Sequence, residues 1–213
     1  MNRIKIVGLG PGNLDYLLPV CRRHIEEAEI LVGGRRNIES LEGMAEKKEI
    51  RYIDRHLGDL MKDLKSQRDK NIVMVVSGDT GFYSMLEYMK KNFGTEELET
   101  YPGISSIQYL FSRCNLSWFD ALVKSVHGRD FDFEELLSRY THLGLLTDKK
   151  NTPQEIARRL CMAGYGGVRI TVGEDLSYSH ERIEEYRARE LAEVVREFNI
   201  NAVIVEGDLN GTH

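Results

Sequence analysis

The chain has 213 residues, of which 41% are hydrophobic and 30% charged, and its formal net charge is −5. This composition is typical of a globular protein, and no stretch reaches the roughly 20 consecutive apolar residues of a membrane-spanning helix, so disordered, fibrous and integral membrane proteins are excluded. The negative charge gives no general attraction to nucleic acid, so an anionic ligand must meet local groups of basic residues.

The first half of the chain alternates between strand and helix patterns. Apolar runs rich in β-branched residues predict strands at residues 3–9, 30–32, 49–53, 71–76 and 98–101. Apolar residues at helical spacing predict helices at residues 14–25, 57–64, 86–89 and 104–111. This alternation favours a mostly parallel sheet covered by helices, with ligand sites beyond the carboxyl ends of the strands.

The pattern pauses near residues 113–117, so we expect one domain over residues 1–114 and a second over residues 117–213. The second series predicts strands at residues 122–126, 142–146, 168–172, 182–186 and 202–205, and helices at residues 133–140, 153–162 and 191–198. The strand at 182–186 is polar and favours antiparallel pairing. We therefore predict an α/β fold with a mixed sheet in the second domain.

Glycine-rich loops follow three predicted strands of the first domain: residues 8–12 (GLGPG), 77–83 (SGDTGFY) and 101–106 (YPGISS). Because the carboxyl ends of parallel strands meet at one edge, we expect the three loops to share a ligand site. Each loop also has a purely structural interpretation. The first could be a tight turn, Asp79 could be the N-cap of the next helix, and the serines of the third could cap a helix.

The loops do not match the common nucleotide motifs. The first lacks the G-x-G-x-x-G spacing, and the second predicted strand ends in Gly33-Gly34-Arg35-Arg36 instead of an acidic residue that would hold a ribose. The Gly-Lys-Ser/Thr of a Walker loop is also missing. A nicotinamide oxidoreductase is disfavoured but stays an alternative, as does a nucleotide-sensing protein without turnover.

Two basic, polar loops follow predicted strands of the second domain: residues 124–129 (KSVHGR) and 146–153 (LTDKKNTP). Guanidinium groups bind carboxylates in a bidentate manner, so these loops could surround a polycarboxylate together with Arg35 and Arg36. Solvated surface is the alternative for each loop, and His127 could be an ordinary hydrogen-bonded loop histidine.

Cysteine and histidine spacing gives no metal site. The three cysteines lie far apart and the six histidines are scattered, so we expect no protein-bound metal and no disulfide framework. The first apolar run leads into a glycine loop rather than a signal-peptide cleavage site, which favours a cytoplasmic protein.

The chain resembles the tetrapyrrole methylase family over nearly its whole length. Five segments carry the resemblance: GLGPG, SGDTGFYS, PGISS, SVHGR and TDKKNTP. The resemblance implies two α/β domains with S-adenosylmethionine in the cleft between them, an open trough for the macrocycle, and commonly a homodimer. The segments GGRRN, SGDTGFYS and HGR are most similar to the branch that methylates a corrin precursor in cobalamin biosynthesis beside a separate carbon-15 methylase and decarboxylase. Methylases of another ring carbon and diphthine synthases stay as alternatives.

The resemblance also implies site residues. Cofactor contacts are predicted for Leu9, Gly10, Pro11, Gly78, Asp79, Gly81, Phe82, Ser105, Ser106, Ile107, Leu146, Val172, Gly173 and Glu174, with Ala202 as a further candidate. Substrate contacts are predicted for Arg35, Arg36, His127 and Arg129. Thr80 stands where many relatives have proline, which would loosen the loop. A sulfonium methyl group is already activated, so the protein needs mainly to align donor and acceptor, and we expect no catalytic nucleophile.

Overall fold

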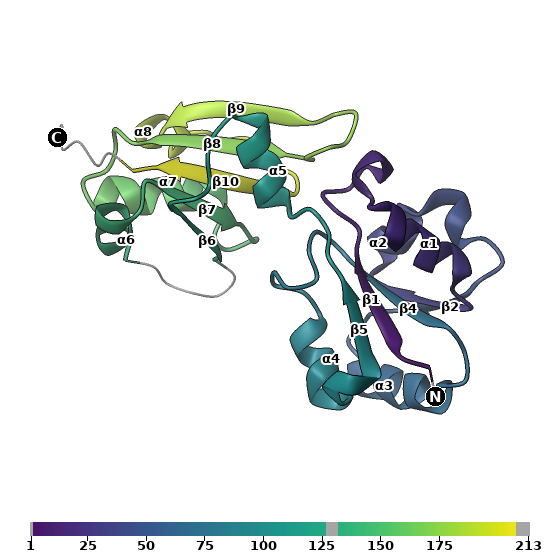
Figure 1. Cartoon of the computed structure of the whole chain (residues 1–213). Coiled ribbons are helices and arrows are strands. Elements are labelled where there is room, and N and C mark those ends of the chain that lie inside the picture. Colours follow the sequence, from purple (N-terminus) through teal and green to yellow (C-terminus); the bar gives the residue numbers. More distant parts are fainter. Residues whose placement is uncertain (1, 127–131, 208–213) are drawn as a thin grey trace. The chain divides into compact units, whose positions relative to one another are not determined.

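The computed structural model describes residues 2–126 and 132–207 of the chain. The chain forms two compact units, Met1–Ser105 and Ser106–His213. Each unit contains a five-stranded sheet with helices packed on it (Figure 1). The predicted fold class, two α/β domains with a mostly parallel first sheet and a mixed second sheet, is confirmed.

The border between the units differs from the predicted domain limits of residues 1–114 and 117–213. Helix α5 (Ser106–Arg113) packs against strands β7 (His142–Leu146) and β10 (Asn201–Glu206) of the second unit. The border therefore lies before this helix. The polar stretch that follows the helix is a loop within the second unit rather than a linker.

The first unit has a wholly parallel sheet in the order β3-β2-β4-β1-β5. Its strands are β1 (Ile4–Gly8), β2 (Ile30–Gly33), β3 (Glu49–Tyr52), β4 (Ile72–Val76) and β5 (Leu98–Tyr101). Its helices are α1 (Pro19–Glu27), α2 (Arg35–Glu39), α3 (Leu57–Ser66) and α4 (Leu86–Asn92). Helices α1 and α2 cover one face and α3 and α4 the other (Figure 1).

Strand β4 explains why the first unit is layered in this way. All five of its residues are buried. Met74 and its alternate neighbours pack with the cluster that contains α3 and α4, whereas Val73 and Val75 pack with the cluster that contains α1. A strand covered by helices on both faces has no polar side, so its sequence reads as a continuous apolar run.

The second unit has a mixed sheet in the order β6-β7-β10-β8-β9. Strands β6 (Ala121–Ser125) and β7 are parallel, while β10 is antiparallel to both β7 and β8 (Arg169–Glu174). Strand β9 (Arg182–Arg187) is antiparallel to β8, as its polar sequence predicted. The other helices are α6 (Phe133–Arg139), α7 (Pro153–Met162) and α8 (Ala188–Leu191).

Two glycines let α5 lie close to the second sheet. A Cβ atom on Gly144 would sit 2.7 Å from the side chain of Ile107, and one on Gly173 would sit 2.7 Å from Leu110. Any larger residue at either position would displace the helix. Helices α7 and α8 cover the opposite face, over a core that includes Leu145.

The predicted helix at residues 191–198 is wrong. Helix α8 begins earlier, where Glu190 accepts a hydrogen bond from the backbone N–H of Arg187 and forms a capping box, and it ends at Leu191. The following backbone is held by side chains instead of helical hydrogen bonds. The Gln154 amide donates to the carbonyls of Val194 and Arg196 at 3.4 and 2.7 Å. Tertiary contacts of this kind override local helix propensity.

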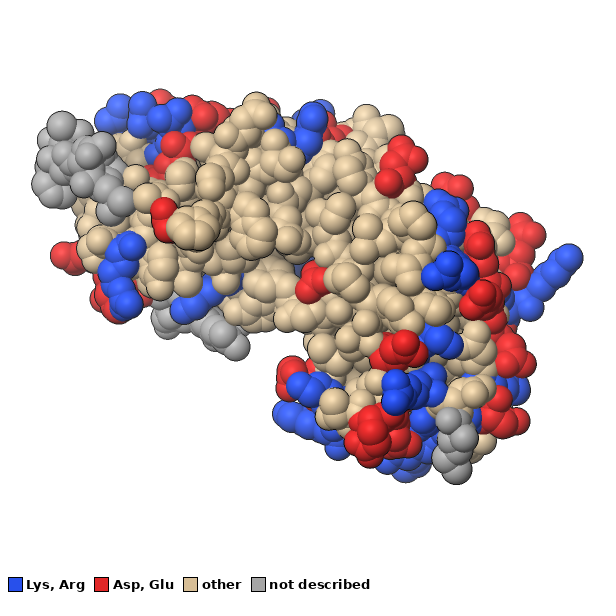
Figure 2. Space-filling view, viewed as in Figure 1, with Lys and Arg blue, Asp and Glu red and all other residues tan. Residues whose placement is uncertain are grey.

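The surface is mixed in charge. On the face shown in Figure 2, basic and acidic side chains lie among one another over each unit, without a large patch of one sign. Within residues 2–126 and 132–207, every helix is too short or too polar to cross a lipid bilayer.

Candidate functional site

The three glycine-rich loops lie at one edge of the first sheet. They follow β4, β1 and β5, which are direct neighbours and run in the same direction. The prediction that these loops meet at a common edge is therefore confirmed. Ligands of open parallel sheets bind at such an edge.

The first two loops are joined through their backbones. The N–H of Gly10 donates to the carbonyl of Gly78 at 3.2 Å, and the N–H of Gly78 donates back to the carbonyl of Gly10 at 2.9 Å. Both residues have a left-handed backbone, with φ of 81° for Gly10 and 67° for Gly78. Glycine is the residue that adopts this conformation without steric cost.

The third loop packs on the other two with almost no space between backbones. A Cβ on Gly8 would lie 2.5 Å from the carbonyl oxygen of Gly78 and 2.7 Å from the nitrogen of Gly103. A Cβ on Gly103 would clash with the same carbonyl and lie 2.9 Å from Gly8. The glycines that attract a nucleotide interpretation are thus required for contact between the loops.

Asp79 connects the second loop to the third. Its carboxylate accepts hydrogen bonds from the N–H of Gly81 at 2.8 Å and from the N–H of Gly103 at 3.0 Å. The N-cap interpretation is wrong, since α4 starts at Leu86 and Met85 occupies its N-cap position. Contact between Asp79 and a cofactor stays a prediction, and each carboxylate oxygen retains a second lone pair.

The remaining predicted residues at this edge combine buried and accessible groups. Leu9 and Ser105 are buried, Pro11 and Phe82 are half-buried, and Gly81 is exposed. These residues present backbone groups, a hydroxyl and apolar surface to one edge.

Sequence reasoning gave no role to Tyr83, the neighbour of Phe82. Its ring meets that of Phe82 edge to face at 4.8 Å, and its side chain is 49% exposed. Its φ of 51° is disfavoured for an aromatic residue. Such backbone strain gathers at functional sites, so the structure adds Tyr83 to the residues to test. No local pattern in the sequence signals the strain.

In the second unit, three candidate cofactor residues form a row across the sheet. Ala202 pairs with Leu146 on one side and with Gly173 on the other, and Leu146 pairs with Ser125. These positions face α5, since a Cβ on Gly173 would touch Leu110. Ser106 and Ile107 begin α5 on this same face, with Ile107 fully buried.

Val172 and Glu174 face the opposite side of the sheet and have internal partners. Val172 belongs to the core under α7. Glu174 is only 4% exposed, and its carboxylate accepts from Arg196 Nη2 at 2.6 Å and from the N–H of Asn199 at 2.8 Å. These contacts explain both side chains structurally. A cofactor contact from either stays a prediction, for which the backbone is the available group.

The polar segment after β7 mainly holds its own loop. The Asp148 carboxylate accepts from the N–H groups of Lys150 and Asn151 at 2.7 and 2.6 Å. The Asn151 amide donates to the carbonyl of Val126 at 2.7 Å, and Thr152 caps α7. Lys149 and Lys150 are exposed and are the residues of this segment that extend into solvent.

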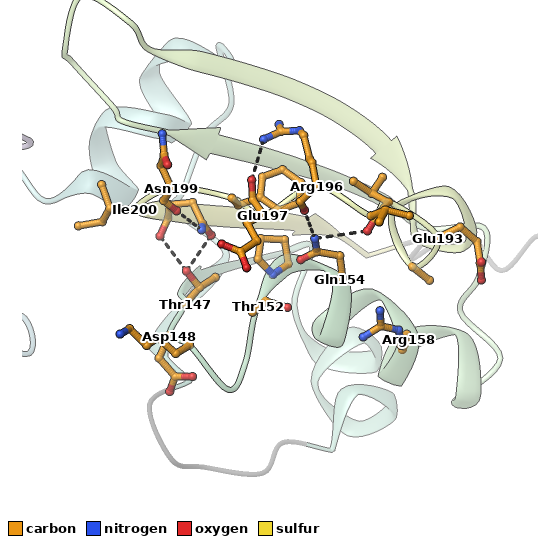
Figure 3. Close-up of a pocket in the computed structure, with 17 residues that line it drawn as sticks. Thr147, Asp148, Thr152, Gln154, Arg158, Glu193, Arg196, Glu197, Asn199 and Ile200 are labelled. Carbon is orange, nitrogen blue, oxygen red and sulfur yellow. Dashed lines mark hydrogen bonds between the residues drawn. The ribbon is translucent and has the colours of Figure 1, made fainter.

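A pocket of about 1140 Å³ lies beside this segment on the α7 side of the second sheet (Figure 3). Its lining comes from the loop after β7, the first turns of α7 and residues 192–201. On the wall of the pocket, the Thr147 hydroxyl donates to the side-chain oxygen and the carbonyl oxygen of Asn201, at 2.7 and 2.9 Å. The predicted cofactor residues do not line this pocket. Leu146, Gly173 and Ala202 lie on the other face of the sheet, toward α5.

The predicted substrate residues are only partly described. Arg35 and Arg36 are exposed at the start of α2, just beyond the carboxyl end of β2. The guanidinium of Arg35 lies over the Tyr52 ring at 4.5 Å. His127 and Arg129 lie outside the described residues.

Two titratable side chains near the glycine loops, Cys21 and His24, pack against the third loop and the strand before it. Burial raises the pKa of the Cys21 thiol, which donates to the carbonyl of Pro102 at 3.4 Å. Burial and then the charge of Lys5 lower the pKa of His24, whose ring packs on Tyr101. The described part of the chain holds no group of histidines, cysteines and carboxylates that could bind a metal.

Comparison with known proteins decides the family. The model of tetrapyrrole (corrin/porphyrin) methylases matches residues 3–192. The chain belongs to the tetrapyrrole methylase family. It is 31% identical over 202 residues to the cobalt-precorrin-7 C(5)-methyltransferase of Salmonella typhimurium, covering 95% of this chain and 98% of the relative.

Two other similarities place this methylase among its relatives. It is 28% identical to the precorrin-6Y C(5,15)-methyltransferase [decarboxylating] of a Sinorhizobium species, over 96% of this chain and 50% of that protein. Its fold matches the uroporphyrin-III C-methyltransferase of Thermus thermophilus in complex with S-adenosylhomocysteine, with a TM-score of 0.79, 21% identity, and 96% and 92% of the two chains covered.

The protein is thus an enzyme, an S-adenosylmethionine-dependent tetrapyrrole methyltransferase. The nicotinamide oxidoreductase and the non-catalytic nucleotide-binding protein are no longer alternatives. The residues present at the glycine-loop edge fit this cofactor, because packed backbones, a serine hydroxyl and the half-buried Phe82 ring suit a ligand with polar and apolar parts.

Proposed function

We propose that this methylase transfers a methyl group to ring carbon 5 of cobalt-precorrin-7 during cobalamin biosynthesis. The observation that carries the proposal is the Salmonella relative of that activity, which aligns with this chain over nearly the full length of both. The GGRRN and SGDTGFYS segments favour the same branch. A cytoplasmic location would suit this biosynthetic role.

S-adenosylmethionine supplies an activated sulfonium methyl group when bound. In the first unit, Leu9, Gly10 and Pro11 of the first loop and Gly78 to Phe82 of the second would contact it. In the second unit, Ser106, Ile107, Leu146 and Gly173 would do so. The chain's contribution is to bind and orient the reactants, since alignment of donor and acceptor supplies much of the rate of such a transfer.

The substrate would be a polycarboxylate held partly by Arg35 and Arg36, with His127 and Arg129 as further contacts. Paired guanidinium and carboxylate groups form bidentate, charge-assisted hydrogen bonds, which orient a ligand as well as bind it. We assign no proton-transfer residue.

Association with other chains is also part of the proposal. The protein would act as a homodimer and beside a separate carbon-15 methylase and decarboxylase. The Sinorhizobium relative supports the second association, because this chain corresponds to half of a protein whose name includes both methylations and the decarboxylation.

The decisive experiment combines purified protein, S-adenosylmethionine labelled with ¹³C in the methyl group, and cobalt-precorrin-7. We expect one labelled methyl group at carbon 5, located by NMR of the product. The metal-free macrocycle and precursors of other methylation steps serve as comparison substrates. Transfer to another carbon would assign the chain to a different branch of the family, and transfer to a protein substrate would favour a diphthine synthase.

A further inference from the structure

The edge of the first sheet is divided into two halves of different chemistry. The glycine loops follow β4, β1 and β5, whereas β3 and β2 form the other half of the same edge. Arg35 and Arg36 follow β2 there, and Arg55 and His56 follow β3. Because adjacent strands lie about 5 Å apart, Arg35 and Arg36 begin one strand away from the loop after β4, and Arg55 and His56 begin two strands away.

Two buried or half-buried arginines of this unit are ion-paired, whereas the arginines at the edge are not. Arg51 contacts Glu49 and Asp63 at 2.5 and 2.7 Å, and the buried Arg68 contacts Glu97 at 2.6 Å.

By contrast, Arg35, Arg36 and Arg55 are all exposed. Among residues 2–126 and 132–207, none of the three has a carboxylate ion-pair partner. The adjacent Asp54 carboxylate is engaged locally, since it accepts from the N–H of His56 at 2.7 Å. Asp54 also interacts electrostatically with Arg55, and Arg35 and Arg36 add positive charge at this edge that an anionic ligand can meet.

Tyr52 holds one of these arginines in place. The Arg35 guanidinium lies over its ring at 4.5 Å, and Tyr52 is itself 40% exposed at the end of β3. Stacking on an aromatic face restrains the guanidinium but leaves its N–H donors free. A Cβ on the adjacent Gly34 would have no atom within 4 Å, so there is open space beside the arginine.

We propose that Arg35, Arg36 and Arg55 form a carboxylate-binding strip for the acidic side chains of the macrocycle, with Tyr52 as the positioning residue of Arg35. Arg55 and Tyr52 are its new members, since the sequence motifs pointed to neither. The proposal rests on the proposed function for the identity of the ligand. Its physical basis is the fork of guanidinium donors, which matches carboxylates.

Equilibrium binding to the full-length protein with S-adenosylhomocysteine bound tests the strip. The probe is uroporphyrin, whose ring carries acetate and propionate groups, compared with mesoporphyrin, which keeps the ring but has fewer carboxylates. Porphyrin fluorescence reports binding. Arg35→Gln and Arg55→Gln should each raise the dissociation constant for uroporphyrin about two- to fivefold, as expected for solvent-exposed ion pairs. The effect on mesoporphyrin should be smaller.

Matched variants separate the strip from general electrostatics. Arg3→Gln removes an exposed arginine before β1, at the opposite end of the sheet, and should leave uroporphyrin binding unchanged. Tyr52→Leu should weaken binding, and Tyr52→Phe should restore it because the ring face remains. The affinity for S-adenosylhomocysteine should stay the same in every variant, which shows that the fold is intact.

Three results would overturn the proposal: no uroporphyrin binding by the unaltered protein, equal binding by the Arg35 and Arg55 variants, or an equal loss in Arg3→Gln. Its failure is distinguishable from that of the proposed function. Methylation of a carbon other than 5, with the variant pattern as expected, would leave the strip standing. If the protein methylated carbon 5 but the Arg35 and Arg55 variants bound uroporphyrin normally, the proposed function would stand and only the strip would be rejected.

Discussion

The edge at the carboxyl ends of the first sheet's strands and the edge at the carboxyl ends of β6, β7 and β8 in the second sheet are built in different ways. In the first unit, three loops meet through backbone contacts between Gly8, Gly78 and Gly103, and one carboxylate, that of Asp79, links them. In the second unit, the strand ends are tied by side chains, such as Glu174 to Arg196 and Thr147 to Asn201.

This difference teaches how far a motif can be interpreted. Where backbones touch, only glycine fits, so a glycine motif in the sequence indicates where the loops are in contact. Where side chains join the loops, the same polar residues that suggest a ligand site are already engaged with one another. The glycine motifs are therefore the stronger guide to the site, and the polar motifs are the stronger guide to loop structure.

The largest expected effect comes from filling the contact between the first unit's loops. Gly103→Ala should lower the free energy of unfolding by about 3 kcal/mol, because its methyl group would overlap backbone atoms that cannot rotate away. Urea denaturation followed by circular dichroism measures the loss. Gly34→Ala is the matched control, since its Cβ meets open space, and it should cost no more than about 1 kcal/mol, from the loss of glycine at the N-cap of α2. Equal effects of the two substitutions would contradict the account of the loops.

The next effect tests the side-chain ties of the second unit. Glu174→Ala should cost about 2 kcal/mol, because the N–H of Asn199 loses a buried acceptor while Arg196 keeps its contact with Glu184. Fluorescence of Trp118, the single tryptophan and a residue of this unit, follows the urea transition. Unchanged stability together with a large loss of S-adenosylhomocysteine affinity would show instead that Glu174 serves the cofactor.

Asp79 allows a smaller and sharper test. Asp79→Ala removes the acceptor of two backbone N–H groups and should destabilise the protein by about 1 to 2 kcal/mol. Asp79→Asn keeps one carbonyl acceptor and should recover part of this stability. Calorimetric titration then measures the affinity of each variant for S-adenosylhomocysteine, which tests the predicted cofactor contact separately from stability. If the folded Asp79→Ala protein bound S-adenosylhomocysteine as tightly as the unaltered protein, Asp79 would only join the loops and would not contact the cofactor.

The smallest effect is a pH dependence at the end of β5. The Tyr101 hydroxyl donates to Glu99 at 2.6 Å, and this hydrogen bond raises the pKa of Tyr101 from 10.0 to about 12. A raised folded-state pKa means that the contribution to stability is complete below pH 10 and is lost as the pH rises to 12. The urea midpoint of the unaltered protein should exceed that of Tyr101→Phe at pH 8, and the difference should shrink at pH 11. A constant difference would contradict this assignment.

The sequence predicted most of the fold because its signals were local. The continuous apolar run of β4 indicated a strand covered by helices on both faces. The repeated order of strand, glycine loop and helix indicated that the loops meet at one edge of the sheet. The helix expected at residues 191–198 failed because Gln154 and Glu174, distant in sequence, hold that backbone. The border between the compact units differs from the expected domain limit because α5 packs on Gly144 and Gly173, whose missing side chains make room for it.

The site was predicted by motif and resemblance more than by local chemistry. The sequence located the glycine loops, but it could not show that Asp79 joins Gly103 or that Tyr52 supports Arg35. Both contacts depend on strand order, which brings residues together that are 24 and 17 positions apart. The strain at Tyr83 also arises only once the loop has folded.

Hydrogen exchange of the protein with and without S-adenosylhomocysteine tests the central claim most directly, because it reports both edges at once. We expect slower exchange in residues 9–13, 78–84 and 103–107 and near Leu146 and Gly173, with no change in residues 192–200 beside the α7 pocket. Protection confined to residues 192–200, with the glycine loops unaffected, would contradict it and move the cofactor to the pocket of the second unit.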